Sequence, residues 1–412
     1  MTDLRTRPAD VFLRGFGTAD GIEWGLWLAA TVYWITIVGL SEPELALLGI
    51  VLEVTVILSE TPTGVIADVR SRRQSLIVAQ VLMGLSFAWT FASGDLLMLL
   101  ASHALLGFGW TFRSGADVAW ITDELSGGDE TVDDTVIERL LLRRTRLGMI
   151  ISLIVGPLTI AIGWFWSVRA VGLLLSFAYI AIAIWMAFAM TEDHFTPGSE
   201  RGAGFVTTLR EGIDVVRTRP RLRTLILIAA LFFTASELFG RIGFFYLLET
   251  ADLRSLDGSG ESLVITGVLF FVSALGGIAI NRGAERALEG GGEIARIAGA
   301  MLILAALGGL LVATSSVVVV IGIGLLLHVS VEEAMYPLMD GWVNGDAPSE
   351  VRATVHSLIG QTVSISQIGG VIVLVAVAEA ASVPFAFGVA TALIALSAVI
   401  ALGSKQREPV SS

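Results

Sequence analysis

Apolar residues form long runs along this chain, and short polar segments separate one run from the next. A helix needs about 20 apolar residues to cross the roughly 30 Å hydrocarbon core of a bilayer, where no backbone group can go unpaired. Runs of this length recur along the whole chain. The pattern predicts twelve membrane-spanning helices, near residues 20–40, 44–67, 75–93, 95–120, 147–166, 168–190, 223–248, 262–281, 294–313, 316–339, 354–377 and 382–403.

Composition supports a membrane protein. Of the 412 residues, 54% are hydrophobic and only 16% are charged, which differs strongly from a soluble globular domain. The segment before the first run contains acids and arginines and no small-residue cleavage site. We therefore expect the first helix to be retained rather than removed as a signal peptide.

Several classes of function lack the residues that they need. The absence of cysteine excludes disulfides and thiolate metal sites, and the four histidines are too scattered to suggest a metal site. The single lysine, Lys405, follows Gly403 and Ser404, whereas a Walker A loop needs Gly-Lys-Ser/Thr. No G-x-S-x-G or H-E-x-x-H pattern occurs. A net charge of −12 disfavours nucleic acid. We expect no enzyme activity, metal, cofactor or nucleic-acid partner.

Basic residues are distributed unequally between the two sides of the predicted spans. With a cytoplasmic N-terminus, 22 of the 26 basic residues fall on the cytoplasmic side. Arg169 and Arg254 fall on the opposite side, and Arg113 and Arg241 lie inside spans. The positive-inside rule then predicts a multi-pass protein with both termini in the cytoplasm. We expect the plasma membrane of a prokaryote.

The longest internal polar segment follows the sixth span and divides the chain. It predicts an N-terminal six-helix half at residues 1–190, a cytoplasmic linker with an amphipathic helix at 191–222, and a C-terminal six-helix half at 223–412.

Two spacings suggest that the second half repeats the first. Gly64 and Asp68 are four apart after the second span, as Gly277 and Asn281 are after the eighth. The stretch AWITD at 119–123 is similar to GWVN at 341–344, which is followed by Asp346. Both pairs occupy equivalent places in the predicted topology. We therefore expect a degenerate internal repeat.

The stretch GVIADVRSRRQSL at 64–76 resembles the loop 2–3 signature of the major facilitator superfamily. It departs from that signature at Val69, where a basic residue is usual, and at Ser71, where glycine is usual. Within the superfamily, four stretches resemble the twelve-helix branch of drug:proton antiporters of the macrolide and tetracycline efflux type: ADVAWITDEL (116–125), MTEDHFTP (190–197), ASELFGRIGFFYLLE (235–249) and WVNGDAPSEVRATVHSLIGQTVSISQIGG (342–370). The resemblance implies an all-α membrane protein with twelve transmembrane helices in two pseudo-symmetric six-helix bundles. We expect a monomer in the lipid bilayer.

The same resemblance implies a conformational latch formed by Gly64, Asp68, Arg72, Arg73 and Asp123. Asp68 would dock against the N-terminal end of span eleven, whose dipole favours an anion. Arg72 would pair with Asp123 or Glu124 at the cytoplasmic end of span four. Alternatively, these charges only anchor the topology of the helices.

Charged residues inside the predicted spans are candidates for proton coupling or for the substrate cavity, because such residues are costly in lipid and usually face the bundle interior. Asp20 and Glu23 share a face of span one, where Glu23 is the better candidate for a proton carrier and Asp20 fits the cytoplasmic entrance. Glu53 and Glu60 in span two are proton or cation sites, or neutral hydrogen-bonded carboxyls.

Two acid–base spacings predict ion pairs along single helices. Arg113 and Asp117 in span four, and Glu237 and Arg241 in span seven, are each four residues apart. Each pair is either a structural clamp or a switch operated by a proton or a substrate.

Span ten holds adjacent acids, Glu332 and Glu333, of which at most one can face a cavity. His103 stands where the family's span-four signature has arginine, four residues before Gly107. It fits either proton coupling or a hydrogen-bonded structural role. In span five, Ile160 and Ala161 replace the paired glycines of the antiporter motif, which weakens the indication of antiport.

Three functions compete. The leading hypothesis is a secondary transporter that exports small amphiphilic, drug-like compounds by proton antiport with alternating access. The second is a permease for proton-coupled or facilitated uptake of a small metabolite. The third is a non-transporting sensor or scaffold, which gives no reason for placing Glu23, Arg113, Asp117, Glu237 and Arg241 within spans.

Overall fold

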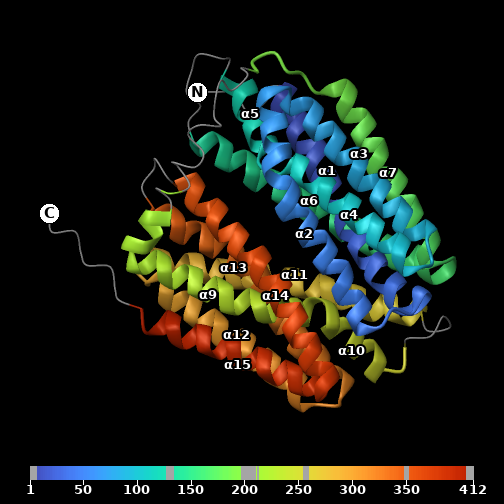
Figure 1. Ribbon diagram of the computed structural model, residues 1–412. Helices are drawn as coiled ribbons and strands as arrows, with labels where there is room; N and C mark the ends of the chain where they lie inside the picture. The colour runs from blue at the N-terminus through green and yellow to red at the C-terminus, as the bar shows by residue number, and fades with distance from the viewer. Residues whose placement is uncertain are drawn as a thin grey trace. The chain divides into compact units, whose positions relative to one another are not determined.

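The computed structural model describes residues 7–126, 134–195, 210, 213–253, 259–347 and 352–404, and most of them are helical (Figure 1). The helices are α1 (Arg7–Val32), η1 (Tyr33–Val38), α2 (Glu42–Val69), α3 (Arg72–Ala92), α4 (Leu96–Arg113), α5 (Ala116–Ser126), α6 (Asp134–Phe165), α7 (Val168–Ala189), α9 (Pro220–Glu237), η2 (Leu238–Ile242), α10 (Gly243–Thr250), α11 (Ser259–Glu289), α12 (Ile294–Thr314), α13 (Val318–Asp346), α14 (Arg352–Ala380) and α15 (Val383–Leu402). η1 and η2 are π-helical segments.

Within the described residues, eleven helical segments are long and apolar enough to cross a membrane. α2 brings the number to twelve when its two parts, Glu42–Glu60 and Pro62–Val69, which meet at an angle of 45°, are counted as one span. Pro62 lies at this bend, and proline removes a backbone hydrogen bond from a helix interior. The predicted all-α membrane fold is confirmed.

Two helices are longer than the spans predicted within them. α1 begins at Arg7 and α6 at Asp134, well before the predicted spans start at residues 20 and 147. Both helices continue through polar residues that an apolar pattern does not mark. Span four is also not continuous, because α4 ends at Arg113 and α5 begins at Ala116. Gly115 lies between them with φ of 72°, a left-handed conformation that glycine adopts without strain.

Contacts divide the chain into two compact units, Met1–Ser199 with Leu253–Gly267, and Glu200–Asp252 with Val268–Ser412. In the first unit, α1 packs against α6 and α7, and α3 packs against α4 and α7. In the second, α9 packs against α14 and α15, and α12 packs against α13 and α15. The same order of packing therefore occurs in both units. The predicted division at residues 190 and 222 stays a prediction, and much of the predicted linker helix lies outside the described residues.

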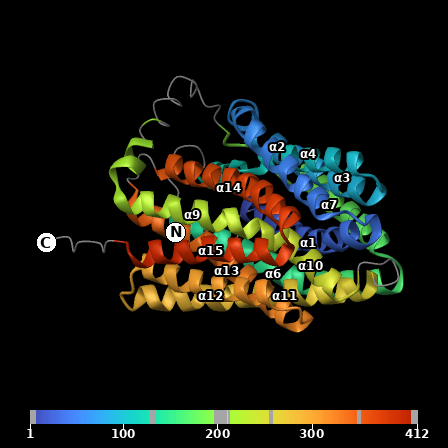
Figure 2. The ribbon, with the colours of Figure 1, turned by 60° about the horizontal axis from the view of Figure 1, so that its bottom comes forward.

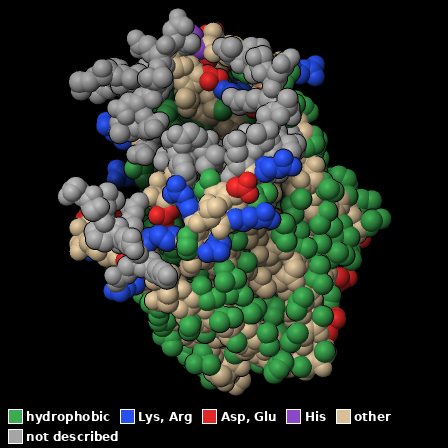
Figure 3. All heavy atoms as spheres, turned by 60° about the vertical axis from the view of Figure 1, so that its left-hand side comes forward, with side chains coloured by type: hydrophobic (Ala, Val, Ile, Leu, Met, Phe, Trp, Pro, Cys, Tyr) green, Lys and Arg blue, Asp and Glu red, His purple; other side chains and the backbone are tan. Residues whose placement is uncertain are grey.

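Large apolar side chains are exposed on the helices. Examples with more than two thirds of their surface exposed are Leu58, Leu97, Phe165 and Phe188. Figure 3 shows such side chains covering much of one face, with arginine side chains gathered towards one end of it. A surface of this kind suits contact with lipid chains rather than with water.

Gly370 in α14 lies against the backbone of α9. A Cβ atom at this position would lie 2.1 Å from the carbonyl oxygen of Thr234, and backbone cannot move aside as a flexible side chain can. We expect Gly370→Ala to destabilise the protein by about 1–3 kcal/mol, the range for overpacking. Gly369→Ala is the matched control, because no atom lies within 4 Å of its added Cβ. Thermal unfolding of the two purified variants would check this, and equal melting temperatures would contradict it.

Candidate functional site

Small residues on α1 bring this helix close to α6. Gly17, Gly21 and Gly25 recur every four residues, so they share one helix face. A Cβ atom added to Gly21 would lie 2.6 Å from Ile151 and 2.8 Å from the carbonyl oxygen of Gly148. Small residues allow two membrane helices to approach in this way. Asp20, next to this face, is thereby brought within reach of Arg144 on α6.

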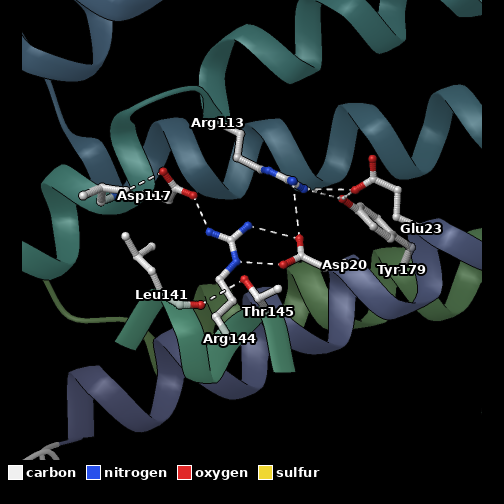
Figure 4. A network of polar contacts seen from close by, with 9 residues as sticks. Asp20, Glu23, Arg113, Asp117, Leu141, Arg144, Thr145 and Tyr179 are labelled. Carbon is white, nitrogen blue, oxygen red and sulfur yellow. Dashed lines mark hydrogen bonds and ion pairs between the residues drawn. The ribbon is translucent and has the colours of Figure 1, made fainter. Parts of the chain in front are cut away.

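Arg144 holds two acids from different helices (Figure 4). Its Nε and Nη2 donate to the two carboxylate oxygens of Asp20 at 2.7 and 3.1 Å. Its Nη1 donates to Asp117 Oδ2 at 2.5 Å. The guanidinium also lies over the ring of Phe16, 5.0 Å from the centroid. Bidentate pairing of this kind fixes geometry as well as charge. Arg144 therefore ties together α1, α5 and α6.

Arg113, at the end of α4, continues the network. Its Nη2 lies 3.3 Å from Asp20 Oδ1, and its Nη1 donates to Glu23 Oε2 at 3.1 Å. Tyr179 on α7 donates its hydroxyl to the same Glu23 oxygen at 3.4 Å. Arg113 also donates to the Tyr179 hydroxyl oxygen at 3.4 Å. Figure 4 shows both arginines pointing into the space between these acids.

Within this network, three carboxyl groups meet two guanidinium groups. If all five are ionised, the group carries one surplus negative charge. Glu23 and Asp117 are only 6% and 8% exposed, and Tyr179 is buried. Asp20, with 26% of its side chain exposed, is the most accessible of the three acids.

The predicted pair of Arg113 with Asp117 does not form. The spacing of four residues assumed one continuous helix, but the chain breaks at Ser114–Gly115 between α4 and α5. Arg113 instead pairs with acids of α1, and Asp117 pairs with Arg144. Both residues belong to one network, though not to each other.

Arg144 and Tyr179 were not among the site residues predicted from the sequence, and Asp20 was predicted to lie at the cytoplasmic entrance. Arg144 was counted as a loop residue because the predicted span began at residue 147. The glycines at positions 17, 21 and 25 are the signal that marks α1 as a close-packed helix with Asp20 at its interface.

His103 and Glu53 lie apart from this network. His103 is buried, and its Nδ1 lies 2.9 Å from the carbonyl oxygen of Leu99, one turn before it on α4. Its ring packs against Trp34 with centroids 4.9 Å apart. Glu53 is half-buried on α2 and Glu60 is exposed. Their part in coupling stays a prediction.

The second unit contains the predicted pair of Glu237 and Arg241. Arg241 Nε contacts Glu237 Oε1, and Gln367 of α14 donates to Glu237 Oε2 at 3.3 Å. Arg241 lies in η2, where the helix widens to π-helical turns. Such turns recur at functional sites.

Glu332 and Glu333 lie in the middle of α13. The side chain of Glu332 is half-buried. The side chain of Glu333 is exposed and lies beside Gly277 of α11. Within the described part of the chain, neither carboxyl makes an ion pair or hydrogen bond. The part of Glu333 in proton coupling or in the substrate cavity stays a prediction.

Arg72 is the first residue of α3 and belongs to the loop 2–3 signature. Its side chain contacts three residues of the first unit. Its Nη2 lies 3.2 Å from Asp68 Oδ1, its Nη1 contacts Asp123 Oδ2, and Nη1 also donates to the carbonyl oxygen of Ala119 at 3.2 Å. Asp123 is thus the acid that pairs with Arg72. Glu124 instead accepts from residues 191–194.

Arg73 binds the end of α7. Its Nε and Nη2 donate to the carbonyl oxygens of Met190 and Ala187 at 2.9 and 2.5 Å. A cation is favourable at a helix C-terminus, where carbonyl groups lack partners. A Cβ at Gly64 would meet no atom within 4 Å. The latch role of these residues, and the docking of Asp68 on span eleven, stay predictions.

No protein-family model and no curated protein matches the sequence. Solved structures do match. A POT family transporter in complex with 5-aminolevulinic acid gives a TM-score of 0.74 at 15% identity, covering 96% of this chain and 95% of that one. The nucleoside transporter NupG gives 0.69 at 12%, covering 96% and 100%. The human organic anion transporter MFSD10 gives 0.61 at 18%, covering 96% and 99%. This chain therefore has the fold of these membrane transporters.

Proposed function

We propose that this protein is a secondary transporter of the major facilitator type, which exports small amphiphilic compounds in exchange for protons. Glu23 is the proposed proton carrier. The observation that carries the proposal is the buried network of three carboxyl groups and two arginines on α1, α4, α5 and α6.

Glu23 suits this role better than the other two acids. Asp20 accepts three contacts from two arginines, and Asp117 accepts from Arg144 and from the backbone amide of Val118. Glu23 has one arginine, which it shares with Asp20, and the Tyr179 hydroxyl. Protonation there sacrifices the least Coulombic attraction.

Protonation of Glu23 changes the whole network. Without the Glu23 charge, Arg113 has only Asp20 as a close acid, which weakens the hold of Arg144 on Asp20 in turn. A ligand shifts a conformational equilibrium only through differential affinity for the two states. A proton that rearranges the contacts between α1, α4 and α6 binds the two conformational states with different affinity. A cationic substrate that takes the place of the proton does the same.

α5 connects the proton site to the latch. Asp117 in its first turn binds Arg144, and Asp123 near its end binds Arg72. The two acids are six residues apart, about 9 Å along a helix. Gly115, with a left-handed φ of 72°, separates α5 from α4, so α5 is not a rigid extension of α4. A shift of Arg144 is therefore transmitted to Arg72 through one short helix.

Asp123→Asn tests this connection. The substitution removes the charge that pairs with Arg72 and leaves the network around Glu23 intact, so we expect normal membrane insertion with a reduced transport rate. Transport in proteoliposomes, beside protein yield in the membrane, would measure both. Normal turnover together with normal insertion would reject the latch.

Uptake of a small metabolite is the second candidate function. Transporters of the same fold include the POT family transporter in complex with 5-aminolevulinic acid and the nucleoside transporter NupG. The direction of flux distinguishes the two functions. In inverted membrane vesicles with an acid interior, proton antiport drives compounds into the vesicles, whereas proton symport drives them out.

A further inference from the structure

Gln80 on α3 carries a buried amide without a partner. None of its surface is exposed, and within the described part of the chain neither its Oε1 nor its Nε2 makes a hydrogen bond. Other buried polar side chains of the same helix are satisfied, because Ser75 and Ser86 each donate to a backbone carbonyl oxygen, at 2.9 and 2.7 Å. An unpaired buried amide costs free energy, and native proteins rarely keep one without a use for it.

The neighbour of Gln80 on one side is the end of α4. α3 packs against α4 and α7, and the three helices run side by side in Figures 1 and 2. α3 and α4 are joined by a short turn, so they run in opposite directions. A Cβ atom added to Gly109 of α4 would lie 3.1 Å from Met83 of α3. Arg113 is one turn further along α4, about 6 Å nearer the start of α3, and is therefore level with Gln80.

The neighbour on the other side is α7. This helix also runs opposite to α3, because Arg73 at the start of α3 donates to carbonyl oxygens at the end of α7. A Cβ atom added to Gly84 of α3 would lie 3.4 Å from the ring of Tyr179. Gln80 is one turn before Gly84 and is therefore level with Ala183, whose methyl group offers no hydrogen bond.

The network around Glu23 begins one turn from this amide. The Tyr179 hydroxyl lies 3.8 Å from Sδ of Met83, which is three residues after Gln80 on the same helix face. Figure 4 shows the Tyr179 hydroxyl and the Arg113 guanidinium meeting at the Glu23 carboxylate. Packed helix axes lie about 8–10 Å apart, a distance that an arginine side chain spans. A change of rotamer therefore brings the Arg113 guanidinium within reach of the Gln80 amide.

Two carboxylates hold Arg113 away from Gln80 when both are ionised. Arg113 Nη1 donates to Glu23 Oε2 at 3.1 Å, and its Nη2 lies 3.3 Å from Asp20 Oδ1. Hydrogen bonds to an ionised acceptor are roughly twice as strong as those to a neutral one, so the amide does not compete. A neutral Glu23 loses this advantage. The carbonyl oxygen of Gln80 is then an equivalent acceptor for a guanidinium N–H.

We propose that Gln80 is a positioning residue for Arg113 and accepts one of its N–H groups when Glu23 is neutral. The inference rests on the function proposed above, in which Glu23 carries the proton. Protonation of Glu23 turns Arg113 from α1 towards α3, and release of the proton returns it. The amide that is unpaired in one state is thus paired in the other, and it stabilises the protonated form.

A double-mutant cycle between Gln80→Met and Glu23→Gln tests this pairing by thermal unfolding of the purified protein. Methionine keeps the length of the side chain without an amide, and Glu23→Gln keeps position 23 neutral. In the wild-type background we expect Gln80→Met to raise the unfolding temperature by about 2–4 °C, because it removes an unpaired buried amide. In the Glu23→Gln background we expect a fall of similar size, because the substitution removes the partner of Arg113.

Ser86→Ala is the matched control. It removes a satisfied hydrogen bond from the same helix and should lower the unfolding temperature equally in both backgrounds. The same shift for Gln80→Met in both backgrounds would overturn the proposal, since the amide would then not respond to the charge of Glu23. A fall in the wild-type background would also overturn it, because the amide would then already have a partner, such as a bound water. The cycle measures stability alone, so a failure of proton-driven transport would contradict the proposed function without changing the result of the cycle.

Discussion

Glu23→Gln is expected to abolish proton exchange while leaving the protein folded and able to bind its substrates. Glutamine keeps the shape of the side chain and a carbonyl oxygen for Arg113 and Tyr179, but it cannot gain or lose a proton. The substitution fixes the network in its neutral form. We expect proton-driven transport to fall to the background of empty vesicles, whereas exchange of substrate for substrate persists.

Asp10→Asn is the control for Glu23→Gln. Asp10 is an acid of the same helix, α1, but its ion pair with Arg14 is exposed and lies outside the network. This variant should retain proton-driven transport. Equal loss in both variants would show that the effect comes from charge on the helices in general and not from the network.

Arg144→Leu is expected to have the largest effect on stability. It leaves Asp20 and Asp117 without their strongest partner inside the helix bundle. Breaking a buried ion pair from one side costs about 3–5 kcal/mol, because an uncompensated charge remains. We expect a large drop in the thermal unfolding temperature of the purified protein.

Arg14→Leu provides the comparison, because the ion pair of Arg14 with Asp10 is exposed, with 69% and 57% of the two side chains accessible. Exposed pairs contribute about 1 kcal/mol or less. Adding Asp20→Asn and Asp117→Asn to Arg144→Leu should recover part of the stability, since it removes the charges left unpaired. Equal unfolding temperatures for the Arg144 and Arg14 variants would contradict the structural role of the network.

The apolar pattern was sufficient to predict the fold. Twelve apolar runs and the distribution of arginines indicate a bundle of membrane helices, because a bilayer imposes length and polarity on each span. Pairs within one unbroken turn were also predictable, as Glu237 and Arg241 show.

The network around Glu23 could not be predicted from spacing. Its contacts join helices that are distant in sequence, and sequence spacing reports only neighbours on one helix. The break at Gly115 turned Asp117 away from Arg113, and the close approach of α1 to α6 gave Asp20 a partner 124 residues away. Arg144 was missed because apolar runs mark the bilayer core and not the full length of a helix.

The central claim is that a substrate is exchanged for a proton carried by Glu23. The most direct test follows the internal pH of inverted vesicles with an acid interior while lipophilic cations and neutral drugs are added, for the wild type and for Glu23→Gln. We predict that at least one compound dissipates the gradient with the wild-type protein and not with the variant. Failure of every compound with folded wild-type protein, or equal dissipation by the variant, would contradict the account.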